Sequence, residues 1–144
     1  MLKGTNLSKE SPIFPLTINV LPGGYLPLQI FEPRYLDMVK RCMSQEIGFC
    51  VVLLRGQKDI KSSKFPDHSP IGTHVEIVDF NRLENGLLGI TVQGQYRIKI
   101  LDRRIQEDGL IVGDTIEQAE EEESISLEPK YKNIWRILRE ISNH

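Results

Sequence analysis

The sequence predicts a small α+β domain that is mainly β, in which a strongly bent sheet or barrel carries one inserted helix and one terminal helix. Apolar stretches of strand length alternate with glycine- and proline-rich turns along most of the chain, which favours such a sheet. Two segments, 33–45 and 129–144, instead repeat their apolar residues at helical spacing. A chain of 144 residues is long enough for one domain with its own core.

The first expected strand covers residues 13–20, after a polar N-terminal segment, residues 1–11, that we expect to be flexible. Apolar residues alternate along this strand, and Pro15 favours an edge or a bulge because proline lacks an N–H donor. Residues 22–24 read Pro-Gly-Gly, which is typical of a turn because glycine adopts positive φ. A second strand, 25–31, is expected after this turn.

Pro33 marks the expected start of the inserted helix, because the first helical position needs no N–H donor. The helix is predicted over 33–45, where apolar residues recur every three or four positions. The continuous apolar run at 48–55 is typical of a central strand. Residues 56–70 are polar and contain two prolines, so they predict a surface loop.

The next expected strand, 71–80, alternates so that Thr73, Val75, Ile77 and Asp79 share one side. Asn85-Gly86 follows it as the strongest hairpin signal in the chain.

Residues 87–94 and 95–104 predict two further strands that meet at Gly94. A glycine turn and a last strand are expected within 107–116. The β domain is thus expected to cover 12–117, before an acidic connector at 118–128. The amphipathic helix at 129–144 is either a short helical end or the start of a longer helical region.

Composition gives no reason to expect a strongly charged partner. The chain has 18 basic and 20 acidic residues and a net charge of -2, which does not favour nucleic acid or an anionic membrane. We found no apolar stretch long enough for a signal peptide or a membrane span, so a cytoplasmic protein without membrane association is expected. Cys42 and Cys50 are expected to be buried free thiols, with a disulfide between them as the alternative.

No arrangement of residues predicts catalysis or metal binding. The chain has no G-x-S-x-G, no glycine-rich phosphate loop and no histidine or cysteine spacing typical of zinc sites. We therefore predict no catalytic, cofactor-binding or metal-binding residue, and a protein that is not an enzyme. A basic stretch, Arg97, Lys99, Arg103 and Arg104, leaves RNA binding as an alternative, which the negative net charge disfavours.

The stretch "IFPLTINVLPGGYLPLQIFEPRYLDMV", residues 13–39, resembles the start of the Lon protease N-terminal (substrate-binding) domain family. Later segments follow in the family's order: "GFCVVL" at 48–53, "IGTHVEI" at 71–77 and "ITVQGQYRIKI" at 90–100. The resemblance covers about residues 12–115.

This resemblance implies a PUA-like bent β-barrel with an inserted helix. It also implies a module that binds unfolded or client proteins, with Lon protease as a further candidate partner and self-association left open. RNA binding by other PUA-like folds is an analogy at the level of the fold only. This chain carries neither an ATPase motif nor a Ser-Lys peptidase motif, so proteolysis does not carry over. The chain is expected to be either a stand-alone version of the domain or an N-terminal fragment of a full ATP-dependent protease.

The residues that match the family signature are expected to be structural rather than ligand-binding; they are Pro22, Gly23, Phe31, Glu32, Pro33, Arg34 and Tyr35. Glu32 and Arg34 flank the predicted helix start, where they are expected to fix the helix against the barrel. Tyr25 and Leu26, beside the Pro-Gly-Gly turn, are the candidate peptide contacts.

Overall fold

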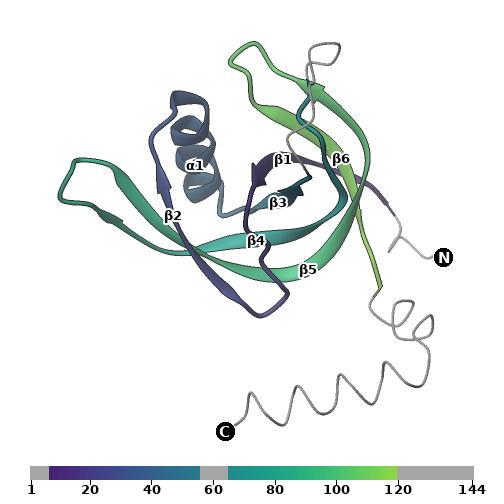
Figure 1. Ribbon diagram of the computed structural model, residues 1–144, viewed down its shortest axis with the longest axis horizontal. Helices are drawn as coiled ribbons and strands as arrows, with labels where there is room; N and C mark the ends of the chain where they lie inside the picture. Colours follow the sequence, from purple (N-terminus) through teal and green to yellow (C-terminus); the bar gives the residue numbers. More distant parts are fainter. Residues whose placement is uncertain (1–6, 56–64, 120–144) are drawn as a thin grey trace, which may run out of the picture.

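The computed structural model describes residues 7–55 and 65–119, which form a mainly β domain with one helix (Figure 1). In chain order the elements are β1 (Lys9–Leu16), β2 (Tyr25–Ile30), α1 (Pro33–Gln45), β3 (Phe49–Leu54), β4 (His68–Arg82), β5 (Leu88–Ile105) and β6 (Ile111–Glu117). The predicted α+β, mainly β class is confirmed. The acidic connector beyond residue 119 and the predicted helix at 129–144 lie outside the described residues.

All six strands belong to one strongly bent sheet with the order β2-β5-β4-β3-β1-β6. Since β6 pairs with the second half of β5 as well as with β1, the pairings run in a circuit through β1, β3, β4, β5 and β6. The β1–β3 pair is parallel and the others are antiparallel. The first half of β5, together with β2 and the end of β4, extends beyond this circuit and curves beside α1 (Figure 1). Because β2 and the adjoining parts of β5 and β4 stay outside the circuit, the expected barrel is realised as one strongly bent sheet and not as a closed barrel.

The strand β1 begins before the predicted strand 13–20. Lys9–Ser11, the last residues of the segment expected to be flexible, pair with Gly113–Thr115 of β6 and belong to the strand. These residues are polar, and only the pairing with β6 makes them a strand. Pro15 lies where β1 has β3 alone beside it among the described residues, which is the edge position predicted for it.

The strand β5 is continuous over 18 residues, whereas two strands meeting at Gly94 were predicted. Gly94 is needed for close approach: a Cβ there would lie 2.3 Å from the Leu21 carbonyl oxygen. The Gly94 N–H donates to Gly24 O and Gly94 O accepts from the Gly23 N–H, both at 2.8 Å. The predicted turn at 22–24, in which Gly23 has φ 85°, is thus tied directly onto the middle of β5.

The strand β4 is longer at both ends than the predicted strand 71–80. His68–Pro70 were expected in the polar loop 56–70, but they belong to β4, and His68 pairs with Leu54 of β3. Residues 56–64 lie outside the described part. The hairpin to β5 forms at the predicted Asn85-Gly86, where Gly86 has φ 86°. Its turn is closed by the Leu83 N–H, which donates to Leu87 O at 2.8 Å.

The helix α1 covers residues 33–45, as predicted, with Pro33 in its first turn. Its buried side chains are Tyr35, Met38, Val39 and Cys42. They pack with Phe14, Phe49, Val75, Ile90 and Val92 in the larger of two core clusters. Each such buried apolar side chain contributes about 1.5–3 kcal/mol to folding, which explains why α1 is held inside the bend of the sheet.

A smaller cluster lies on the side of β1, β3 and β6 and contains Ile13, Cys50, Val52, Ile98 and Ile111. Within residues 7–55 and 65–119, no helix is long and apolar enough to cross a membrane.

Candidate protein-binding groove

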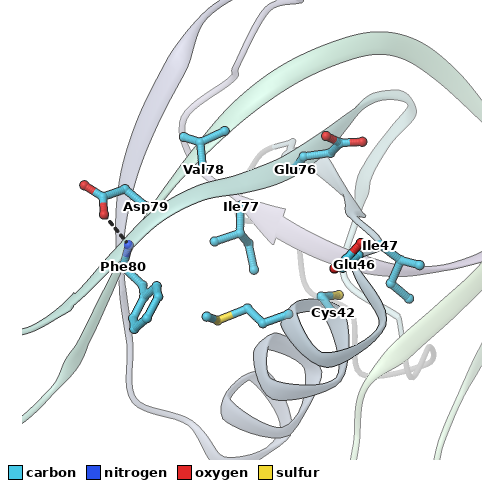
Figure 2. Close-up of a pocket in the computed structure, with 9 residues that line it drawn as sticks. Cys42, Glu46, Ile47, Glu76, Ile77, Val78, Asp79 and Phe80 are labelled. Atoms are coloured by element: carbon cyan, nitrogen blue, oxygen red, sulfur yellow. Dashed lines mark hydrogen bonds between the residues drawn. The ribbon is translucent and has the colours of Figure 1, made fainter.

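A groove lies between the C-terminal end of α1 and the outer edge of β4 (Figure 2). It holds about 390 Å³. Its lining residues are Cys42, Met43, Glu46 and Ile47 at the end of α1, and Glu76, Ile77, Val78, Asp79 and Phe80 of β4. We call this the α1–β4 groove. Apolar side chains form most of its wall, and four of them are exposed: Met43, Ile47, Val78 and Phe80.

The groove exists because the chain leaves the line of β3 where it joins α1. The last β3–β4 pair in this direction is Phe49 opposite Val75. Gly48, just before β3, lies so close to β4 that a Cβ there would be 2.1 Å from the Val75 carbonyl oxygen. The residues before Gly48 no longer follow β4, because α1 ends at Glu46. Among the described residues, Glu76–Arg82 therefore have no neighbouring strand on this side.

A bulge in β4 directs Phe80 toward α1. Ile77 and Asp79 pair with consecutive residues of β5, so Val78 is an extra residue. Simple alternation predicted Asp79 on the side of Ile77, and this is wrong because the bulge reverses the alternation after Val78. Figure 2 shows Ile77 and Phe80 pointing toward the helix, with Val78 on the opposite side of the strand.

Glu46, which ends α1, is locally unfavourable in two ways. Its φ of 56° and ψ of 47° are left-handed, a conformation that usually belongs to glycine or asparagine at this position. Its carboxylate also lies at the negative end of the helix dipole, an arrangement that costs up to about 1 kcal/mol. Glu46 therefore does not favour the helix end that it occupies, and it lies in the groove wall.

The polar rim of the groove is acidic. Glu46, Glu76 and Asp79 line it, and none of them forms an ion pair within the described part of the chain. The Asp79 Oδ1 accepts a hydrogen bond of 2.8 Å from the Phe80 N–H (Figure 2). The remaining carboxylate groups are available to a cationic ligand group.

A second hollow adjoins the first beyond Phe80. This hairpin pocket holds about 360 Å³ and lies between α1 and the β4–β5 hairpin. Its lining residues are Ile30, Phe31, Leu36, Lys40, Phe80, Asn81, Arg82, Gly86, Leu87 and Leu88. Phe80 lines both hollows, and Phe31 adds a further exposed apolar side chain. Together the two hollows form what we call the apolar trough, with acids at one end and Lys40 and Arg82 at the other.

The Glu-Pro-Arg-Tyr segment lies at the start of α1 and is engaged within the fold. The Arg34 Nε donates to Glu32 Oε1 at 3.0 Å, and its Nη1 donates to Gly109 O at 2.8 Å. The Tyr35 ring stacks on Phe14 with centroids 4.1 Å apart. A hollow of about 490 Å³ beside these residues has a largely apolar lining, including Phe14, Leu54 and Ile105, and its charged groups, Glu32 and Arg34, already bond to each other.

The other sequence-predicted positions are spread along β2 and its preceding turn. Tyr25 is 65% exposed, and its hydroxyl accepts a hydrogen bond of 3.2 Å from the Gln93 amide, whereas Leu26 packs partly against the core. Both lie at the start of β2, roughly 13–16 Å from the Ile30 end that borders the hairpin pocket. Phe31, treated as structural, is the signature residue that lines the trough.

The sequence analysis missed Phe80 and Ile47, which come together only in the fold. The available signal was the placement of Val78 and Phe80, two large apolar residues, beside acids in a strand expected to be half exposed.

The buried cysteines offer no reactive thiol. Cys42 and Cys50 are free, as predicted. Burial raises the pKa of each thiol to about 11, so both are protonated at neutral pH. Among the described residues, no group of three His, Cys, Asp or Glu side chains is placed to hold a metal ion.

The basic stretch that left RNA binding open is partly engaged in the fold. The Arg103 guanidinium lies over the Phe65 ring at 4.2 Å, and its Nη1 is 2.6 Å from His68 Nε2. Arg104 pairs with Glu10 and Asp114. These two arginines therefore do not form a free basic stripe for phosphates.

Comparison with known proteins places this geometry in a family. The pattern of the ATP-dependent protease La (LON) substrate-binding domain matches residues 10–144. The LON peptidase N-terminal domain and RING finger protein C14F5.10c of Schizosaccharomyces pombe is 32% identical over 108 residues, covering 67% of this chain and 22% of that protein. Protein cereblon of Gallus gallus is 28% identical over 103 residues, covering 69% of this chain and 22% of that protein.

Solved structures agree with this assignment. The Lon N-terminal domain protein from Xanthomonas campestris has a TM-score of 0.66 and 32% identity, covering 77% of this chain and 60% of that one. The N-terminal domain of Mycobacterium avium complex Lon protease shares the fold, with a TM-score of 0.56 and 14% identity, over 94% of this chain and 76% of that one. The chain spans about a fifth of the length of the curated relatives it matches. It belongs to the family of ATP-dependent protease La (LON) substrate-binding domains.

Proposed function

We propose that this domain is a non-enzymatic recognition module that binds unfolded client polypeptide in the apolar trough. The observation that carries the proposal is the position of Phe80, exposed and shared by two adjoining apolar hollows. Further large exposed apolar side chains line these hollows, namely Phe31, Met43 and Ile47, with Val78 on the opposite side of β4. A contiguous apolar surface with a polar rim is typical of a protein-binding site.

Membership of the substrate-binding family supports this assignment. The chain covers about a fifth of its curated relatives, so our proposal concerns recognition by the domain and no proteolytic step. Delivery of the bound client to a Lon protease is the partner relationship that fits this role.

The test is binding of fluorescently labelled, reduced and carboxymethylated α-lactalbumin, a protein that stays unfolded at neutral pH. We expect the wild-type chain to bind it, to leave it uncleaved, and to bind about tenfold more weakly as Phe80→Ser, since tenfold in affinity corresponds to about 1.4 kcal/mol. The matched control is Leu101→Ser, because Leu101 is 53% exposed and Phe80 is 57% exposed. Leu101 lies in β5 and lines neither hollow.

No binding by the wild-type chain at tens of micromolar would overturn the proposed function. A loss with Tyr25→Ser but not with Phe80→Ser would place the contact at the start of β2 and overturn the assignment to the trough.

A further inference from the structure

We propose that the client segment binds as an added β-strand along the open edge of β4, with basic residues at the end that lies against Glu46 and Glu76. This inference rests on the proposed function and adds to it a binding mode and a class of substrate: extended, apolar segments next to lysine or arginine. The edge from Glu76 to Arg82 is seven residues, or roughly 20 Å, which suits a strand of similar length.

Backbone groups on this edge are directed outward. Antiparallel pairs alternate between those that exchange hydrogen bonds and those that do not. The hydrogen bond from the Leu83 N–H to Leu87 O fixes this alternation, so Asn81 bonds to β5 while Phe80 and Arg82 present their N–H and C=O groups on the other side. The bond from the Phe80 N–H to the Asp79 side chain agrees with this orientation. The Phe80 carbonyl and both Arg82 groups remain for an incoming strand.

The outer edge of β2 is less suited to strand addition. Pro27 pairs with Thr91, whose backbone groups are directed toward β4 by the same alternation. The Pro27 nitrogen therefore faces outward, where it supplies no donor, and proline at such a position protects an edge. In the stretch 76–82 of β4 there is no proline.

Side chains of an added strand would alternate between the two faces of the sheet. Those on the inner face would meet Met43, Ile47 and Phe80, and those on the outer face would lie beside Val78. Main-chain bonds with pockets for alternate side chains are the recognised mode of strand addition.

The negative charge of the groove favours a basic peptide segment as the occupant of the β4 edge. The acids Glu46, Glu76 and Asp79 lie along the edge without ion pairs in the described part, so they favour a basic segment. A second copy of the chain, paired edge to edge through the same strand, is the alternative occupant, and the variants described below distinguish it from a peptide.

The test uses a fluorescein-labelled peptide in which valine alternates with threonine over seven residues, with two lysines at one terminus. Two further peptides carry backbone N-methyl groups on the odd or on the even residues of this segment. Strand addition predicts that one methylated set binds at least tenfold more weakly and the other within twofold of the parent, because only alternate N–H groups face β4. Replacing the lysines with glutamates should weaken binding at least tenfold.

Two variants test the edge from the protein's side. Arg82→Pro removes an outward N–H without removing a bond to β5, and Arg82→Ala is the control for the lost charge. We expect Arg82→Pro to bind the lysine peptide at least fivefold more weakly than Arg82→Ala does. Thermal melting checks that both variants are folded.

The outcomes separate this inference from the proposed function. Equal effects of the two methylated sets, or α-lactalbumin binding through Phe80 with no binding of any peptide, would overturn strand addition and leave the recognition role in place. A change in oligomeric state with Arg82→Pro, without a change in peptide affinity, would show that a second copy occupies the edge and would also overturn the inference. Loss of all polypeptide binding in the wild-type chain would overturn both.

Discussion

The two ends of helix α1 differ in what their side chains do. At its start, Arg34 bonds to Glu32 and to the carbonyl of Gly109, and Tyr35 is buried against Phe14. At its end, Glu46 takes a left-handed conformation, and Ile47 stays exposed beside an open strand edge. The start of the helix is therefore engaged within the fold, whereas its end leaves apolar surface exposed beside the Glu46 carboxylate. Most residues of the family signature belong to the engaged start of the helix, whereas Phe31, just before it, lines the apolar trough.

The largest expected effect is on stability, at the start of the helix. Tyr35→Ala removes a buried ring and its stacking contact with Phe14, so it should lower the free energy of unfolding by about 3–4 kcal/mol. Met43→Ala, at the exposed end of the same helix, should cost less than about 1 kcal/mol. Urea titrations measure both, and equal losses would contradict the difference between the two ends.

A comparable loss of stability should follow acidification, and its cause lies in the sheet, at His74 of β4, and not at either end of the helix. Burial lowers the pKa of His74 to about 4, below its usual 6.5, so the unfolded chain binds this proton more tightly than the folded one. The contribution of His74 to the free energy of unfolding is therefore fully present above about pH 6.5. It is lost as the pH drops toward 4, by up to about 3 kcal/mol. Burial also lowers the pKa of His68, which adds in the same direction.

Urea titrations at pH 7 and pH 4.5 should show a smaller difference for His74→Gln than for the wild-type chain. If the variant lost as much stability on acidification, His74 would not be the cause.

An intermediate loss is expected from Arg34→Met. Removing the guanidinium breaks its bonds to Glu32 and to the Gly109 carbonyl, which should cost about 1–2 kcal/mol and leave client affinity within twofold. Glu32→Ala keeps the bond to Gly109 and should cost less, about 0.5 kcal/mol. Thermal melting and α-lactalbumin binding are measured together, with the exposed Arg41→Met as control. Unchanged melting with lost binding would assign Arg34 to the ligand site.

A small effect on stability, with the opposite sign, is expected from Glu46→Gly. Glycine accepts the left-handed conformation and removes a negative charge from the helix end, so the protein should gain about 1 kcal/mol. Binding of the lysine peptide should weaken severalfold, because a carboxylate of the groove is lost. A parallel fall in stability and affinity would show that Glu46 supports the fold instead.

Local features of the sequence predicted much of the fold. Pro33 fixed the start of α1, Asn85-Gly86 located the hairpin, and the apolar run at 48–55 gave β3. These signals depend on backbone chemistry within a few residues. The beginning of β1 could not be predicted in this way, because Lys9–Ser11 are polar and become a strand only through pairing with β6, about a hundred residues later.

The candidate groove was hidden for a related reason. Alternation along 71–80 placed Asp79 beside Ile77, and no local feature shows that Val78 is an extra residue. Gly94 was interpreted as a break between strands, although it is required by the turn that crosses β5. The register of β4 against β5 decides the first case and the packing of the turn at 22–24 onto β5 decides the second, and both depend on segments far apart in the sequence. Tyr25 and Leu26 remain predictions for peptide contact.

The pairing of β1 with β6 has a consequence for how such a domain can be carried. The described domain is entered on β1 and left on β6, and Lys9 lies directly opposite Thr115. A polypeptide can therefore pass into the domain and out of it at nearly the same point on its surface. This arrangement suits insertion of the domain into a longer chain as a cassette, because both connections are made at one place.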